Sequence, residues 1–389
     1  MRCPVARRLF LLPVVLAVSA TLVAASPTPR PTSVSLPVIP SELTSDAPCT
    51  PASKQSAEAR SSTRAALGLN RTWQLTQGSG VTVAVVDTGV AEGVSALAGR
   101  VSAPAGAGED CVGHGSFVAG LIAARSTDAG AFAGVAPLAR ILAVRGTDDR
   151  GVPSVALVAD GIRAAVNGGA EVIAVSAALA DGREQLTSVV AYATAHDALV
   201  VAPAVPDTEN DKDGAAGVYW PASAPGALSV GGTGLVLPAA AAPDLAAPAD
   251  GIVGVGPRGS GSYIASGSSL ASAFVAGAAA LVRSRYPALS AAQTAARLTD
   301  FAYPAVPPRL DPYAAVTAVR STVARAPGAL PDRVRIAPPA SGTPRAVAVL
   351  VAGVSGGLVL LTAAALLVIP RGRARRWRPA DSSPAPPIP

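Results

Sequence analysis

Strand-like and helix-like runs alternate through the middle of this 389-residue chain. The strand-like runs are short, mostly apolar and rich in β-branched residues, whereas the runs between them have helical spacing. Strands that are apolar on both faces belong to a parallel sheet covered by helices on both sides. The strand-like runs are 81–86, 139–144, 172–175, 199–202 and 227–230, and the helix-like runs are 115–125, 155–168, 186–196, 269–286 and 291–300. The pattern predicts an α/β fold with a parallel β-sheet flanked by helices.

The two ends of the chain carry membrane signals. Residues 1–25 combine three arginines with an apolar run that ends in small residues, which predicts a signal peptide; an uncleaved anchor is the alternative. Residues 346–369 contain no charge and are long enough to cross the hydrocarbon core as one helix, with a buried core helix as the alternative. Five arginines follow within 370–389, and positive charge marks the cytoplasmic side. We therefore expect a single-pass protein of the cell membrane, with its main domain extracytoplasmic and a cytoplasmic tail at 370–389.

Two segments without hydrophobic periodicity flank the predicted α/β region. Residues 26–60 are rich in Pro, Ser and Thr, which predicts an extended N-terminal arm. Residues 326–345 contain five prolines, which predicts a semi-rigid linker to the membrane helix. The folded domain is therefore expected at about 61–325.

Composition excludes several classes of protein. Half of the residues are hydrophobic, which excludes a wholly disordered chain. The chain has two histidines and three cysteines, so we expect neither a multi-histidine metal site nor a cofactor. Of the net charge of +6, residues 1–25 contribute +3 and residues 370–389 contribute +4, which leaves −1 for the rest. A nucleic-acid partner is not expected, because such a protein clusters Lys and Arg on its folded domain.

Three short glycine-containing segments supply an Asp, a His and a Ser in that order. They are VAVVDTGV at 83–90, GHGSFVAG at 113–120 and GSSLASAFVAG at 267–277. A serine hydroxyl becomes a nucleophile when a base takes its proton, and an imidazole oriented by a carboxylate suits that role. Asp87 follows a predicted strand, at the edge where open parallel sheets bind ligands. Ser269 begins a predicted helix, whose free N–H groups favour an oxyanion. The predicted catalytic residues are Asp87, His114 and Ser269.

These segments, in this order, resemble the subtilisin-like serine proteases, the subtilases of peptidase family S8. The resemblance covers about residues 75–320 and includes GVAP at 134–137 and YWPA at 219–222. It implies a subtilisin-like fold and a serine endopeptidase that acts on a protein or peptide substrate. By the same resemblance, Asp87 orients His114, His114 is the base and Ser269 is the nucleophile.

The arrangement of arm, domain, linker and membrane helix is similar to that of the mycosins. Mycosins are membrane-anchored proteases that accompany type VII secretion, and a disulfide ties their arm to the catalytic domain. Cys49 in the arm and Cys111, three residues before His114, fit that pattern. The resemblance therefore implies a Cys49–Cys111 disulfide, with two free buried thiols as the alternative, and a type VII secretion membrane complex as a partner.

The sequence departs from the subtilases at the oxyanion site. The family usually carries an asparagine after a strand, and its side-chain amide is one oxyanion donor. An ungapped comparison puts Pro206 at that position, and proline has no donor. Asn210, four residues later, is the nearest amide. Two functions therefore remain open. One is an endopeptidase, slow because the asparagine is absent, and the other is an inactive protease-fold scaffold that stabilises a secretion complex.

Overall fold

The computed structural model describes residues 35–55, 62–104, 106–125, 133–207, 217–235, 237, 241–319 and 343–375. It divides the chain into two units, 1–319 and 320–389. The predicted signal peptide, most of the predicted linker and most of the predicted tail lie outside the described residues.

In the described part of the first unit, seven strands form one parallel sheet in the order β2-β3-β1-β4-β5-β6-β7. Their bounds are β1 Thr82–Asp87, β2 Val101–Ser102, β3 Arg140–Arg145, β4 Val172–Val175, β5 Leu199–Pro203, β6 Ala227–Thr233 and β7 Leu245–Pro248. The two-residue β2 is too short to give a sequence signal, and β7 is not among the strands predicted from the sequence. The five predicted strands are all present.

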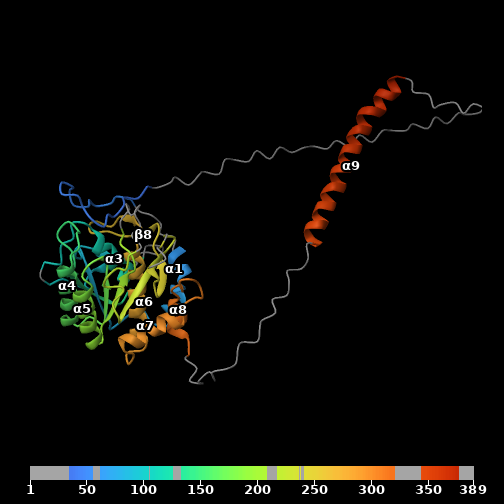
Figure 1. Cartoon of the computed structure of the whole chain (residues 1–389). Helices are drawn as coiled ribbons and strands as arrows, with labels where there is room; N and C mark the ends of the chain where they lie inside the picture. The colour runs from blue at the N-terminus through green and yellow to red at the C-terminus, as the bar shows by residue number, and fades with distance from the viewer. Residues whose placement is uncertain are drawn as a thin grey trace, which may run out of the picture. The chain divides into compact units, whose positions relative to one another are not determined.

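Helices cover both faces of this sheet, as the apolar strands predicted (Figure 1). One face packs against α3 His114–Ala123 and α6 Ser268–Arg285, and the other against α4 Val155–Asn167 and α5 Arg183–Ala195. Alternate residues of β1 enter the two cores: Val83 and Val85 face the side of α3 and α6, whereas Ala84 and Val86 face the other.

The shorter elements surround this three-layer core. They are α1 Ser62–Ala66, α2 Leu69–Thr72, η1 Ser95–Leu97, α7 Ala291–Asp300, α8 Pro312–Thr317 and the antiparallel pair β8 Ile252–Val255 and β9 Ser262–Ala265. The central helix α6 is almost wholly buried, and its small side chains let neighbouring backbone approach. A Cβ on Gly277 of α6 would lie 2.6 Å from Val135 Cβ, which only glycine avoids.

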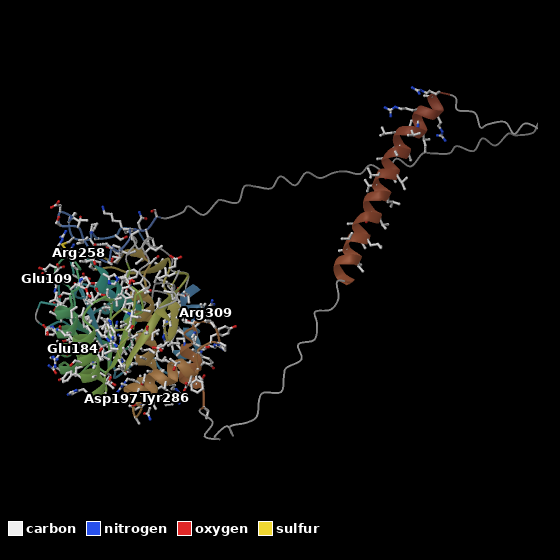
Figure 2. All side chains as sticks on the ribbon, in the orientation of Figure 1. Glu109, Glu184, Asp197, Arg258, Tyr286 and Arg309 are labelled. Atoms are coloured by element: carbon white, nitrogen blue, oxygen red, sulfur yellow. A yellow bond between two sulfur atoms is a disulfide. The ribbon has the colours of Figure 1, made fainter. Side chains whose placement is uncertain are left out.

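The N-terminal segment 35–55, hereafter the arm, lies against the folded unit along β9. Ile39 N donates to Ile264 O and Ile264 N donates to Pro37 O, each at 3.0 Å. Further along the arm, the buried Tyr263 hydroxyl donates to Pro51 O at 2.6 Å. Figure 2 shows Arg258 on the side of the unit that the arm follows, where Arg258 Nη1 donates to Thr50 O at 3.0 Å.

The described part of the second unit is one helix, α9 Thr343–Ala374. Residues Val347–Ala374 have a mean hydropathy of 2.3, so this helix is long and apolar enough to cross a membrane. It includes the predicted span 346–369.

Candidate active site

Three element ends bring the predicted catalytic residues together at the carboxyl edge of the sheet. Asp87 is the last residue of β1, His114 is the first residue of α3, and Ser269 is the second residue of α6. All three side chains are buried among the described residues, with exposed fractions of 1%, 6% and 1%. The strand end and the two helix starts were each visible as local motifs, which is why sequence reasoning found them.

The three side chains form a continuous chain of polar contacts. His114 Nδ1 lies 2.8 Å from Asp87 Oδ2, and His114 Nε2 lies 3.1 Å from Ser269 Oγ. One imidazole nitrogen therefore faces a carboxylate and the other faces a hydroxyl. This is the arrangement in which a histidine can take a proton from a serine while a carboxylate fixes its orientation.

Asp87 is held as a carboxylate. Burial raises the pKa of Asp87, but the His114 charge and hydrogen bonds from His114, Ser176 Oγ and Thr88 N outweigh burial and lower it. Thr88 N donates to Asp87 Oδ1 at 2.6 Å, and Ser176 Oγ donates to Asp87 Oδ2. Ser176 directly follows β4, the neighbour of β1, and the sequence carried no signal for this role.

The surroundings of His114 favour its protonated form. Burial lowers the pKa of the His114 imidazole, but the charge of Asp87 and the hydrogen bonds that the imidazole donates to Asp207 and Asp87 raise it well above its ordinary value of 6.5. The imidazole thus lies between two carboxylates. Both carboxylates favour the protonated form of the imidazole.

Asp207 is the functional residue that sequence reasoning missed. The ungapped comparison put Pro206 at the oxyanion position, but the side chain that contacts Ser269 is that of Asp207, one residue later. Ser269 N donates to Asp207 Oδ1 at 3.0 Å, and Ser269 Oγ donates to Asp207 Oδ2. The chain path beyond β5 is set by contacts with α6 rather than by strand spacing, so an ungapped count could not find this position. Asn210 lies outside the described residues.

Two cavities are lined in part by catalytic side chains. One, of about 190 Å³, is lined by Asp87, His114 and Asp207 together with Ser176–Ala178. The other, of about 650 Å³, is lined by His114, Asp207, Ile264–Ser266 and arm residues 38–42. Because the arm lines both cavities, it forms one wall of the space next to His114.

The arm is fixed covalently beside this site. Cys49 and Cys111 form a disulfide with a Cα–Cα distance of 4.6 Å, as the family resemblance implied. Thr50 N also donates to Cys111 O at 2.9 Å. Within the described part of the chain, no group of three or more His, Cys, Asp or Glu side chains is placed to hold a metal ion.

Comparisons with known proteins agree with this geometry. The subtilase family matches residues 78–321. Mycosin-3 of Mycobacterium tuberculosis is 30% identical over 390 residues, which cover 79% of this chain and 83% of mycosin-3. The structure of the MycP3 protease from the type VII (ESX-3) secretion system is 28% identical, with a TM-score of 0.57 over 75% of this chain and 99% of that one. A chain in the periplasmic assembly of the ESX-5 inner membrane complex is 26% identical, with a TM-score of 0.58 over 77% of this chain and 99% of its own.

Proposed function

This chain belongs to the subtilase family of serine peptidases and is mycosin-like, and we propose that it is an extracytoplasmic endopeptidase of a type VII secretion system. The observation that carries the catalytic part is the contact chain from Asp87 through His114 to Ser269. In this proposal Asp87 orients and stabilises the imidazole, His114 is the general base, and Ser269 is the nucleophile.

The reaction follows from these three roles. Ser269 Oγ attacks the carbonyl carbon of a peptide bond while His114 Nε2 takes the hydroxyl proton, and the carbonyl electron pair moves onto its oxygen. His114 then gives the proton to the amide nitrogen as the C–N bond breaks, which leaves an acyl ester on Ser269. Water attacks this ester as His114 takes a water proton. The acid product leaves, and the proton returns to Ser269 Oγ.

We place the peptidase unit outside the cytoplasm. The signal peptide at 1–25 directs export. The predicted N-terminal segment 26–60, which contains the arm, stays attached through the Cys49–Cys111 disulfide. Residues 326–345 link the domain at 61–325 to the membrane helix. The arginines between 371 and 378 keep 370–389 in the cytoplasm. The α9 helix supports the membrane anchor, and a disulfide is stable in an oxidising compartment.

Association with a type VII secretion complex is supported by similarity rather than by an interface. Mycosin-3 is similar to this chain over most of both sequences, and the ESX-5 periplasmic assembly contains a chain of the same fold. We therefore propose that the unit docks beside a secretion channel and cuts exported proteins there.

A protease-fold scaffold with little or no activity is the second candidate. The observation that favours it is that, among the described residues, Ser269 N donates to the carboxylate of Asp207, whereas the family usually has an asparagine donor beside this serine. Loss of one such donor in subtilisin, a member of this family, costs on the order of 10²–10³ in kcat. A scaffold would tolerate that loss, whereas a peptidase would become slow.

Active-site labelling separates the two candidates. The full chain, solubilised in detergent, is treated with a fluorophosphonate probe that forms a bond only with an activated serine. The proposal predicts labelling that disappears in Ser269→Ala and persists in Ser272→Ala, a matched buried serine one turn along α6. Absence of labelling in a chain whose circular dichroism shows it to be folded would overturn the peptidase and leave the scaffold.

A further inference from the structure

Asp207 is placed where the oxyanion of the reaction would form. Its carboxylate accepts both the N–H and the O–H of Ser269, the two groups that face the carbonyl oxygen and carbon of a bound peptide. The side chain is 8% exposed and packs against the backbone before Ser269. A Cβ added to Gly267 would lie 2.4 Å from Asp207 Cγ, so a glycine there makes room for this carboxylate.

The same carboxylate also faces the catalytic base. Asp207 Oδ2 lies 3.6 Å from His114 Nε2, on the opposite side of the ring from Asp87. The other described charged group on this cavity is Glu42 of the arm, which lines it together with Asp207 and His114. Among the described residues, the charged groups that line the cavities beside His114 are therefore all acidic.

On the basis of the proposed peptidase function, we propose that Asp207 is a catalytic residue of the oxyanion site and that its carboxylate form inhibits this enzyme. As a carboxylate it occupies the oxyanion position, accepts the Ser269 donors and pairs with protonated His114, so the chain rests in a slow state. The peptidase turns over through the form in which Asp207 carries a proton and donates it, as a hydrogen bond, to the oxyanion. A protonated carboxylic acid can serve an oxyanion in this way.

Proton counting shows why the resting state is slow. The resting arrangement has an anionic Asp207 and a protonated His114, which cannot accept the Ser269 proton. The productive arrangement has a neutral Asp207 and a neutral His114, and it contains the same number of protons. A change of pH therefore cannot convert one fully into the other.

This reasoning predicts a gain of activity from a single substitution. Asp207→Asn keeps the shape of the side chain and supplies an N–H donor at every pH. It also removes the negative charge that raises the pKa of His114. We expect kcat/KM for a peptide substrate to rise by about 10²-fold, within the 10²–10³ range of one oxyanion donor. We also expect the dependence of kcat/KM on pH to change from a low bell shape to a single rise that ends in a plateau. That rise, the acid limb of the profile, should lie at lower pH than in the unmodified chain.

Two further variants separate the effect of a hydrogen-bond donor at position 207 from the effect of removing the negative charge there. Asp207→Ala removes the carboxylate but supplies no donor, so it should move the acid limb as Asp207→Asn does and remain about 10²-fold less active than Asp207→Asn. Glu184→Gln removes an exposed charge at the start of α5, at the site labelled in Figure 2, and should change neither property. Equal activity and equal pH profiles for Asp207→Asn and the unmodified chain would overturn the proposal.

A readout that needs no turnover distinguishes failure of this proposal from failure of the peptidase function. The chain has two histidines, so ¹³C-histidine labelling of the full chain in detergent gives two NMR titrations, with His196 as the internal reference. The proposal predicts a lower titration midpoint for His114 in Asp207→Asn and an unmoved His196. An unchanged His114 midpoint overturns the proposed inhibition by the Asp207 carboxylate, whatever the activity. If the midpoint falls but no variant cleaves peptide or reacts with the fluorophosphonate, the oxyanion role is overturned together with the peptidase.

Discussion

Thr88 and Asp110 are joined by a buried hydrogen bond, in which Thr88 Oγ1 donates to Asp110 Oδ1 at 2.8 Å. Asp110 also accepts from Gly113 N at 2.6 Å and from Ser116 N at 2.8 Å. Thr88 Oγ1 in turn accepts from Gly115 N at 2.9 Å. This pair therefore connects the end of β1 to the first turn of α3 and sets the position of His114 relative to Asp87.

Removing the Thr88 hydroxyl should loosen this connection. Thr88→Val keeps the side-chain shape but leaves the buried Gly115 N without its acceptor and removes one of the two donors to Asp110 Oδ1. The unpaired N–H costs about 1–3 kcal/mol. We expect the free energy of unfolding of the full chain in detergent, measured by urea titration, to fall by that amount. Peptidase activity should fall with it because His114 is less well fixed. Thr88→Ser, which keeps the hydroxyl, is the matched control, and an equal loss in both variants would contradict this role.

The pKa shift of His114 predicts a dependence of stability on pH. Because its folded pKa lies well above the ordinary 6.5, His114 binds a proton more tightly in the folded state than in the unfolded state. Its contribution to stability is therefore complete below pH 6.5 and is lost as pH rises through the folded pKa. Urea titrations at a series of pH values should show the free energy of unfolding decreasing across that alkaline window. The decrease should be absent in His114→Ala, and a similar decrease in that variant would assign it to other groups.

The predicted and observed sites differ where tertiary contacts, rather than local pattern, determine position. Asp87, His114 and Ser269 lie at the ends of strongly patterned elements, so their relative placement followed from the carboxyl edge of a parallel sheet. The predicted bounds of β4 and α7 match the structure, and the other predicted elements differ by a few residues at their ends. Asp207 lies four residues beyond β5, in a loop without periodicity. Its approach to Ser269 depends on the space at Gly267, which is a contact across 60 residues of sequence.

The arm shows the same limit of sequence reasoning. Its composition predicted an extended segment, and the family resemblance implied its disulfide. Neither could predict that Val38 would pair with Ile264 beside the cavity at His114, because an isolated bridge has no sequence period. The same applies to Ser176, whose hydrogen bond to Asp87 comes from the end of a neighbouring strand.

The glycine after His114 is required by close packing against β1. A Cβ on Gly115 would lie 2.0 Å from Gly89 O, a backbone atom that cannot move without shifting the start of α3. Gly115→Ala should therefore lower the free energy of unfolding by about 1–3 kcal/mol. Because a displacement of about 1 Å is enough for a 10²-fold loss, peptidase activity should fall by that order. Gly93→Ala is the control, since a Cβ there meets nothing within 4 Å. Unchanged activity in Gly115→Ala would show that the helix start adjusts without moving His114.

The Cys49–Cys111 disulfide should contribute both stability and the attachment of the arm. It closes a loop with a sequence separation of 62, which restricts the unfolded chain and is worth about 4 kcal/mol in the chain-entropy description. A double variant, Cys49→Ser with Cys111→Ser, should lose stability of that order in urea titrations under oxidising conditions. The reduced unmodified chain should match it, and reducing agent should not affect the double variant. Because residues 38–42 also line the cavity beside His114, limited proteolysis should cut the arm of the double variant faster than that of the disulfide-bonded chain. Equal rates of cleavage would mean that the hydrogen bonds along β9 hold the arm without the disulfide.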